Sequence, residues 1–219
     1  MNVLTLVHRT LKVMLDAIAI VLMSPLGACC GLERRFAPRS ERVFDACAQT
    51  VALFPGLPGM ILRRGFYRLA LDSCARDCFI GFGAIFTHRA VSVESGVYIG
   101  PYSMIASSRL RQGCLIASRV SILSGGMLHA RGPSGQWLAT NMTKMVQIEI
   151  GEGAWLGEGA IVIANVGAGA MVGAGSVVPK AVPARVMVAG NPARTIRELE
   201  TAITRAQSEE DHASLASTC

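Results

Sequence analysis

The chain has 219 residues, of which 51% are hydrophobic and only 16% are charged. This composition excludes an intrinsically disordered chain, because disorder requires low hydrophobicity and high charge. Lysine and arginine outnumber aspartate and glutamate by 21 to 15, and the net charge of +6 favours an anionic partner. The basic residues are scattered and form no cluster with aromatic residues, so we expect no nucleic acid as that partner.

Two apolar stretches occupy the first third of the chain. Residues 13–32 are nearly apolar over about the length of a bilayer span, although Asp16 and Pro25 interrupt them. Residues 43–62 form a second, weaker stretch that is broken by prolines. We therefore expect residues 1–78 to form a hydrophobic helical region.

Four arginines between these stretches bear on how the region meets a membrane: Arg34, Arg35, Arg39 and Arg42. If both stretches crossed a bilayer, this basic loop would lie opposite a cytoplasmic C-terminal domain. That placement violates the bias of lysine and arginine toward the cytoplasmic side. A re-entrant or surface-lying helical pair fits the charges better. A cleaved signal peptide and a pair of core helices packed on a soluble domain remain as alternatives.

The seven cysteines are odd in number and irregularly spaced, with no Cys-x-x-Cys pair. This spacing argues against a zinc site, and we expect no metal. Reduced and buried thiols in a reducing compartment are the simpler interpretation.

A six-residue repeat begins near residue 79. Aliphatic residues recur six positions apart in two runs, with a step of five from Ile105 to Leu110 and a step of four from Val162 to Val166. A period of six matches neither an α-helix nor a plain strand, and requires a short strand followed by a sharp corner. Three such hexads close a triangular coil, so the repeat predicts a parallel β-helix over residues 79–192. The two runs are Val93, Ile99, Ile105, Leu110, Ile116, Ile122 and Ile150, Leu156, Val162, Val166, Val172, Val178.

Residues 150–197 carry the most diagnostic part of the repeat, IGEGAWLGEGAIVIANVGAGAMVGAGSVVPKAVPARVMVAGNPARTIR. This run resembles the hexapeptide-repeat acyltransferases, and among them the sugar and polysaccharide O-acetyltransferases. The upstream words LFPGLPG, FYRL, FTHR and VSILSG resemble bacterial members with a hydrophobic N-terminal extension. The resemblance implies a left-handed parallel β-helix, acetyl-CoA as co-substrate, a sugar or glycan acceptor and a homotrimer.

The repeat is interrupted by a long loop, residues 123–149, which contains His129. Long insertions of this kind are usually functional. In the resembling enzymes a histidine on such a loop is the general base, so the resemblance implies that His129 takes the proton from an acceptor hydroxyl. His129 lies slightly farther along its loop than its counterpart in the galactoside and maltose acetyltransferases, where Met127 stands here. His88 is an alternative with a catalytic or acceptor role, or else a cap of the first coil.

By resemblance, coenzyme A binds along the coil edges and at the C-terminal end of the repeat. Arginine offers phosphate a planar fork and lysine a point charge, which suits the cations at that end. Each cation alone could instead be an ordinary surface residue, and the tryptophan could pack between subunits. The expected pantetheine contacts are Trp155, Gly157 and Ala174, and the expected phosphate contacts are Lys180, Arg194 and Arg197.

The sequence therefore predicts an acetyl-CoA-dependent O-acetyltransferase at the inner face of the cytoplasmic membrane, acting on a cell-surface polysaccharide or its lipid-linked precursor. A small-molecule acetyltransferase with a serine or amino-sugar acceptor, and a non-catalytic β-helix scaffold, are the alternatives. A zinc carbonic anhydrase of the same fold is rejected, because it needs three histidines and the domain has only His88 and His129. Residues 193–219 are expected to form a short helix and a tail that is disordered over 208–219.

Overall fold

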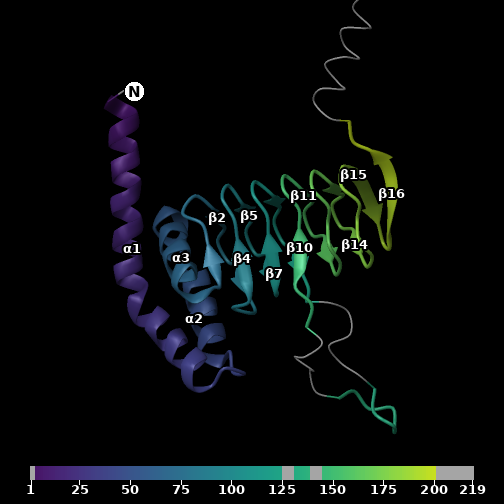
Figure 1. Ribbon diagram of the computed structural model, residues 1–219, viewed down its shortest axis with the longest axis horizontal. Coiled ribbons are helices and arrows are strands. Elements are labelled where there is room, and N and C mark those ends of the chain that lie inside the picture. Colours follow the sequence, from purple (N-terminus) through teal and green to yellow (C-terminus); the bar gives the residue numbers. More distant parts are fainter. Residues whose placement is uncertain (1–2, 125–130, 139–144, 201–219) are drawn as a thin grey trace, which may run out of the picture.

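Three helices precede a stack of short strands in the computed structural model, which describes residues 3–124, 131–138 and 145–200. The helices are α1 (Val3–Phe36), α2 (Arg42–Ala52) and α3 (Gly56–Ala70). They form one end of an elongated molecule, and the coiled strands extend away from them (Figure 1). The helical region expected over residues 1–78 thus ends at Ala70, and the solenoid begins at Ser73, slightly before residue 79.

The strands form three sheets along the three sides of a parallel β-solenoid, which matches the predicted left-handed β-helix. Within these three sheets the strands pair in parallel, except β15 and β16, which pair antiparallel. Sheet A consists of β1 (Ser73–Cys74), β4 (Val91–Val93), β7 (Ser108–Leu110) and β10 (Ile148–Ile150). Sheet B consists of β2 (Phe79–Ile80), β5 (Tyr98–Ile99), β8 (Leu115–Ile116), β11 (Trp155–Leu156), β13 (Met171–Val172), β15 (Val186–Gly190) and β16 (Ala193–Glu198). Sheet C consists of β3 (Ile85–Phe86), β6 (Met104–Ile105), β9 (Ser121–Ile122), β12 (Ile161–Val162) and β14 (Val177–Val178).

The hexapeptide pattern sets the core of the solenoid. Every aliphatic residue of the two predicted runs is at most 2% exposed and points inward. Successive coils approach so closely that some corners accept only glycine. A methyl group on Gly100 would lie 2.6 Å from the carbonyl carbon of Ala117 in the next coil, and one on Gly151 would lie 2.4 Å from the nitrogen of Ala168.

The N-terminal end of this core is closed by α2 and α3. Phe44, Phe66, Tyr67 and Phe86 form a chain of ring contacts from α2 through α3 to β3, with centroids 4.4 to 6.3 Å apart. All four rings are fully buried. A solenoid leaves the core of its terminal coil open to water, and these aromatic side chains cover it.

Arg63 fixes α3 to the solenoid. Its side chain is buried and donates hydrogen bonds to the carbonyl oxygens of Ile80, at 3.1 Å, and Phe54, at 2.6 Å. A buried guanidinium is costly unless its donors are satisfied, so these bonds tie the helix firmly to the first coil.

The C-terminal end of the solenoid ends in a strand. The sequence predicted that a helical segment begins there. Ala193–Glu198 form β16, which pairs antiparallel with β15 and covers the last edge of sheet B. The helix expected after Arg197 falls largely on residues from 201 onward, outside the described part of the chain.

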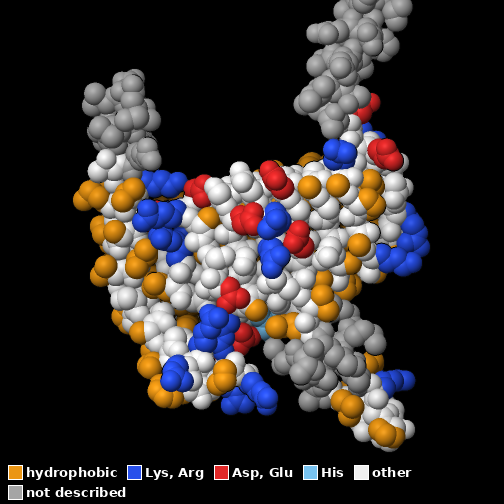
Figure 2. Space-filling model, viewed as in Figure 1, with side chains coloured by type: hydrophobic (Ala, Val, Ile, Leu, Met, Phe, Trp, Pro, Cys, Tyr) orange, Lys and Arg blue, Asp and Glu red, His pale blue; other side chains and the backbone are white. Residues whose placement is uncertain are grey.

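α1 has the inverse of the usual amphipathic pattern. Its buried side chains lie at positions three and four apart, and this seam includes two carboxylates, Asp16 and Glu33. The outer surface is apolar, as the orange side chains along α1 in Figure 2 show. Asp16 forms a buried ion pair with Arg64 of α3, and Glu33 accepts hydrogen bonds from three groups at the start of α2. A helix in water normally places its charges outward.

The buried pair between Asp16 and Arg64 yields a stability prediction. Asp16→Ala leaves the guanidinium of Arg64 buried without its counter-ion, which lowers the free energy of unfolding by about 3–5 kcal/mol. Urea unfolding followed by circular dichroism measures this loss. The matched control is Asp72→Ala, which removes the exposed pair with Arg34 and costs less than about 1 kcal/mol. Equal effects of the two substitutions would contradict the assigned role of the buried pair.

Candidate functional site

All irregular steps of the repeat fall on one edge of the solenoid, where the chain passes from sheet C to sheet A. The steps there are seven residues (Phe86 to Val93), five residues (Ile105 to Leu110), four residues (Val162 to Val166 and Val178 to Val182) or the long insertion, while every other step is six. Isolated bridges continue sheet A through Val166 and Val182, so the short corners still close their coils. We call this edge the variable edge; its described residues are 87–90, 106–107, 123–124, 145–147, 163–165 and 179–181.

Strand register aligns the variable edge into columns. Sheet C pairs its strands residue by residue from β3 to β14, so the second residue after each strand occupies an equivalent position. Four rung intervals separate the two ends of this column, or about 19 Å at the usual strand spacing. The insertion leaves the column at its middle member. The column is His88, Ser107, Ser124, Ala164 and Lys180.

The insertion returns to the place from which it departs. Val146 N donates to Ser124 O at 3.1 Å, and Gln147 Nε2 donates to Ala90 O at 3.3 Å. The second bond ties the returning chain to the corner that carries His88. His129, the predicted general base, lies outside the described residues.

Lys180 lines a hollow of about 320 Å³ at the C-terminal end of the variable edge, together with Arg194. Pro179, Pro183 and Thr195 are among the other lining residues. Neither cation pairs with a carboxylate in the described part of the chain, and the one side-chain bond of Arg194 goes to the carbonyl of Ala193. The structure therefore brings together two of the three predicted phosphate contacts.

Arg197, the third predicted phosphate contact, lies on β16 but does not line this hollow. Residues three apart on a regular strand face opposite ways. Here a bulge shifts the register, so that Ala189 pairs with Arg194 and Met187 pairs with Arg197. Because Ala189 and Met187 are two apart on β15, both arginines lie on the same face of the hairpin.

The predicted pantetheine contacts lie on or beside sheet B. Trp155 is on β11 and is 45% exposed. Gly157 and Ala174 are in close contact, since a methyl group on Gly157 would lie 2.5 Å from the nitrogen of Ala174. Glycine is therefore required at position 157 by coil stacking alone. None of the three lines the hollow beside Lys180.

His88 forms a hydrogen-bonded pair with a carboxylate that the sequence analysis did not single out. Its Nδ1 lies 2.6 Å from Glu41 Oε2, and both side chains are about four-fifths buried. Arg89 donates its backbone N–H and its Nε to the other carboxylate oxygen. Burial by itself would raise the pKa of Glu41, but the hydrogen bonds and charges of His88 and Arg89 outweigh it, so the pKa lies below its ordinary value. The partners are 47 residues apart, and no local pattern links them.

The described cysteines are unpaired thiols. The Sγ atoms of Cys74 and Cys78 lie 3.6 Å apart, and this contact together with burial raises the pKa of Cys74. Among the described residues no group of three histidine, cysteine or acidic side chains is arranged to hold a metal ion.

Comparison with solved structures relates this architecture to known proteins. A maltose O-acetyltransferase from Clostridium difficile 630 is 18% identical, with 74% of this chain and 87% of that chain covered and a TM-score of 0.52. A galactoside acetyltransferase in complex with coenzyme A is 19% identical, with coverage of 73% and 81% and a TM-score of 0.52. AntD, an N-acyltransferase from Bacillus cereus in complex with dTDP-4-amino-4,6-dideoxyglucose and coenzyme A, is 18% identical, with coverage of 63% and 78% and a TM-score of 0.50. No family model and no curated protein matches the sequence.

The chain has the β-solenoid fold of the hexapeptide-repeat acetyltransferases. This confirms the fold that the repeat and the resemblance implied. At these identities the likeness is one of fold.

Proposed function

We propose that the protein is an acetyl-CoA-dependent O-acetyltransferase that modifies a sugar hydroxyl of a cell-surface polysaccharide or of its lipid-linked precursor. The observation that carries the proposal is the hollow lined by Lys180 and Arg194. It combines two cations without a carboxylate partner among the described residues, and it lies at one end of the edge from which the long insertion emerges. Coenzyme A carries phosphates, which such cations recognise. The galactoside acetyltransferase of the same fold was crystallised with coenzyme A.

The proposed reaction is a direct transfer. The acceptor hydroxyl oxygen forms a bond to the carbonyl carbon of the acetyl thioester, and His129 takes the hydroxyl proton. The tetrahedral intermediate then expels the thiolate of coenzyme A, which recovers the proton from His129. Imidazole suits this role because its unperturbed pKa of about 6.5 lies near neutral pH. Trp155, Gly157 and Ala174 are the proposed contacts of the pantetheine arm, and Arg197 supports the phosphates beside Arg194.

We further propose that the protein acts as a homotrimer. Large apolar side chains are exposed on the outer faces of sheets B and C, and Trp155 is among them. Exposed apolar surface of this kind marks an interaction site, and three copies packed side by side would cover it. The others are Tyr98, Met104, Leu115, Ile161 and Ile196.

α1 supports a place at the membrane surface. It contains one stretch, Thr10–Phe36, that is long and apolar enough to cross a bilayer. However, the pair between Asp16 and Arg64 holds it along α3, which in turn is fixed to the first coil. If α1 crossed the membrane, the corners of the first coil would enter the hydrocarbon with it. Unsatisfied backbone groups are costly there. We infer that α1 lies along the cytoplasmic face of the membrane with its apolar side in the interface.

The first prediction of this proposal concerns acetyl-CoA binding. Lys180→Ala/Arg194→Ala removes two charge-assisted hydrogen bonds of about 1.5 kcal/mol or more each, which weakens binding at least tenfold. Isothermal titration of acetyl-CoA into the full chain measures this. The control Arg35→Ala/Arg76→Ala removes the same charge from exposed positions elsewhere and leaves the affinity unchanged. A folded wild-type protein that does not bind acetyl-CoA would favour the scaffold alternative.

The second prediction concerns the base. His129→Ala lowers kcat by about 10²–10⁴-fold, because a positioned general base contributes that factor. Release of coenzyme A in the presence of an acceptor sugar reports the rate. Acetyl-CoA affinity stays at the wild-type value, since His129 does not bind the phosphates. Unchanged kcat would remove His129 from the mechanism.

The third prediction concerns the membrane. Ile18→Ser/Val21→Asn/Leu22→Gln makes the exposed face of α1 polar without touching its buried seam. The variant is expected to float less than the wild type with phosphatidylglycerol vesicles, because the apolar area that enters the interface is smaller. The apolar control Ile18→Leu/Val21→Ile/Leu22→Ile still floats. Equal flotation of both variants would show that α1 does not make the contact.

A further inference from the structure

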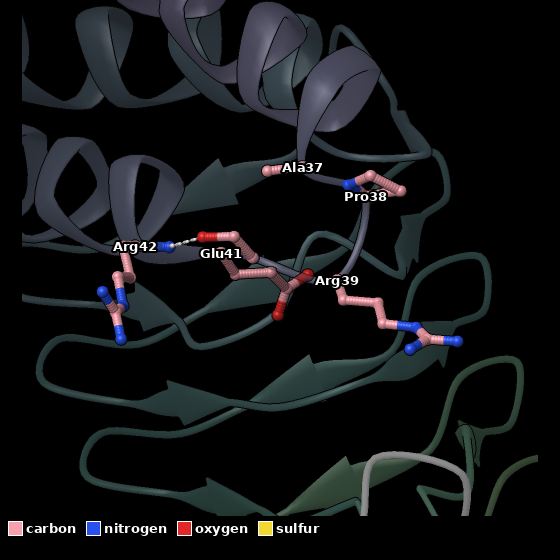
Figure 3. A pocket seen from close by; sticks show the side chains of 6 residues that line it. Ala37, Pro38, Arg39, Glu41 and Arg42 are labelled. Atoms are coloured by element: carbon pink, nitrogen blue, oxygen red, sulfur yellow. Dashed lines mark hydrogen bonds between the residues drawn. The ribbon is translucent and has the colours of Figure 1, made fainter.

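Two hollows lie near the two ends of α1. The hollow lined by residues 37–42 contains Arg39 and Arg42, which extend to opposite sides of Glu41 and do not converge on one ligand (Figure 3). The other hollow has a volume of about 440 Å³ and lies between α1, the N-terminal half of α3 and the first coil of the solenoid. Its apolar lining residues are Leu11, Leu15, Leu57, Met60, Ile61 and Phe79.

This hollow begins where the close packing of α1 on α3 ends. A methyl group on Gly65 of α3 would lie 2.9 Å from Cβ of Ala19, and one on Gly27 of α1 would lie 2.9 Å from Cβ of Leu69. Toward the N-terminal ends of both helices the facing residues are large, and an open volume remains between them. Packing of the two helices alone therefore does not account for the hollow.

The apolar lining continues onto the outer surface of α1. Leu11 and Leu15 line the hollow and are also exposed, and Ile18 and Leu22 extend the same exposed row along the helix. The orange side chains along α1 in Figure 2 belong to this surface. On the α3 side, Leu57 is 72% exposed. Apolar surface that is open to water in this way marks a place where another apolar group binds.

The charged residues of the lining include one cation without an ion pair. Arg64 is buried and is paired with Asp16. Asp77 accepts a hydrogen bond at 2.5 Å from Ser95 Oγ in the next coil. Lys12 is exposed and forms no ion pair in the described part of the chain, although its charge reaches Asp77. An apolar hollow with a lysine at its rim suits a hydrocarbon chain that carries an anionic headgroup.

We propose that this hollow binds an acyl chain of an anionic membrane phospholipid, with Lys12 at the phosphate. A helix that lies in the membrane interface is buried about 5–10 Å deep, at the boundary between headgroups and acyl chains. A hollow beside such a helix lies at the depth where one chain can leave the bilayer and enter it. The inference rests on the proposed place of α1 at the membrane and names the lipid that the protein binds there.

The position of the hollow on the solenoid favours an anchoring lipid over the lipid-linked acceptor. Asp77 and Cys78 lie between β1 and β2, at the corner between sheet A and sheet B. The variable edge, from which the insertion emerges, is the corner between sheet C and sheet A. A lipid in the hollow therefore holds the protein on the membrane and lies at a different corner from the proposed transfer site.

Isothermal titration of the full chain with dodecyl phosphate, below its critical micelle concentration, tests this site. The wild type is expected to bind it saturably, and to bind decyl phosphate about tenfold more weakly because two fewer methylenes are buried. Met60→Trp fills the hollow and should weaken the binding of dodecyl phosphate at least tenfold. The matched control Leu32→Trp adds the same ring at an exposed position of α1 outside the hollow, and should leave the affinity unchanged.

Lys12→Gln separates the contribution of the headgroup from that of the chain. It should weaken the binding of dodecyl phosphate about fivefold, since one lysine contributes about that factor toward an anionic lipid. The binding of dodecyl maltoside, which has the same chain and an uncharged headgroup, should not change. Equal effects on the two ligands would overturn the placement of the phosphate at Lys12.

Circular dichroism verifies that each substituted protein is folded, and acetyl-CoA titration tests the proposed function on the same preparations. A wild-type protein that floats with phosphatidylglycerol vesicles but does not bind dodecyl phosphate overturns the lipid site alone. If Ile18→Ser/Val21→Asn/Leu22→Gln abolishes the binding of dodecyl phosphate, the chain lies on the outer face of α1 and the inference is wrong. If Met60→Trp changes the sedimentation coefficient but not this affinity, a second copy of the chain occupies the hollow, which also overturns the inference.

Discussion

Parallel hydrogen bonding between successive coils is the constraint on which the rest of the structure depends. It fixes the distance between rungs at about 4.8 Å and keeps equivalent residues in register along each side of the solenoid. Side chains therefore stack directly on their equivalents, which demands aliphatic residues inside and small residues at the corners. The close approach of Gly100 to Ala117 and of Gly157 to Ala174 shows how little space remains between coils.

The same register gives the molecule its polar edge. A change in the number of residues between two strands disturbs the sheets least when it falls at a corner. Every such change lies at the corner between sheet C and sheet A. One edge thus carries the long insertion at its middle and the hollow lined by Lys180 and Arg194 at its C-terminal end.

The N-terminal helices close the first coil of the solenoid. Their aromatic residues close the open end of the solenoid core, while buried charges fix the helices to one another and to the first coil. The cost of burying these charges is offset only when their partners are in place. This arrangement leaves the apolar side of α1 outward, so the element that seals the core also presents a surface suited to the membrane interface. The loop that leads from α1 into α2 lies beside His88, because Glu41 of this loop is hydrogen-bonded to His88 Nδ1.

The sequence by itself determined the solenoid, its inward-facing residues, the insertion and the apolar character of the first helix. Each of these features follows from a local repeat or from the local amino-acid composition. It also indicated Lys180 and Arg194, which the last coil and its hairpin bring to one hollow. Only the tertiary structure decided that Asp16 pairs with Arg64, that Arg63 binds the carbonyl of Ile80, and that Glu41 holds His88. These partners are 17 to 48 residues apart. Their meeting depends on how the helices pack against the first coil, and neither a period of six nor a helical period carries that information.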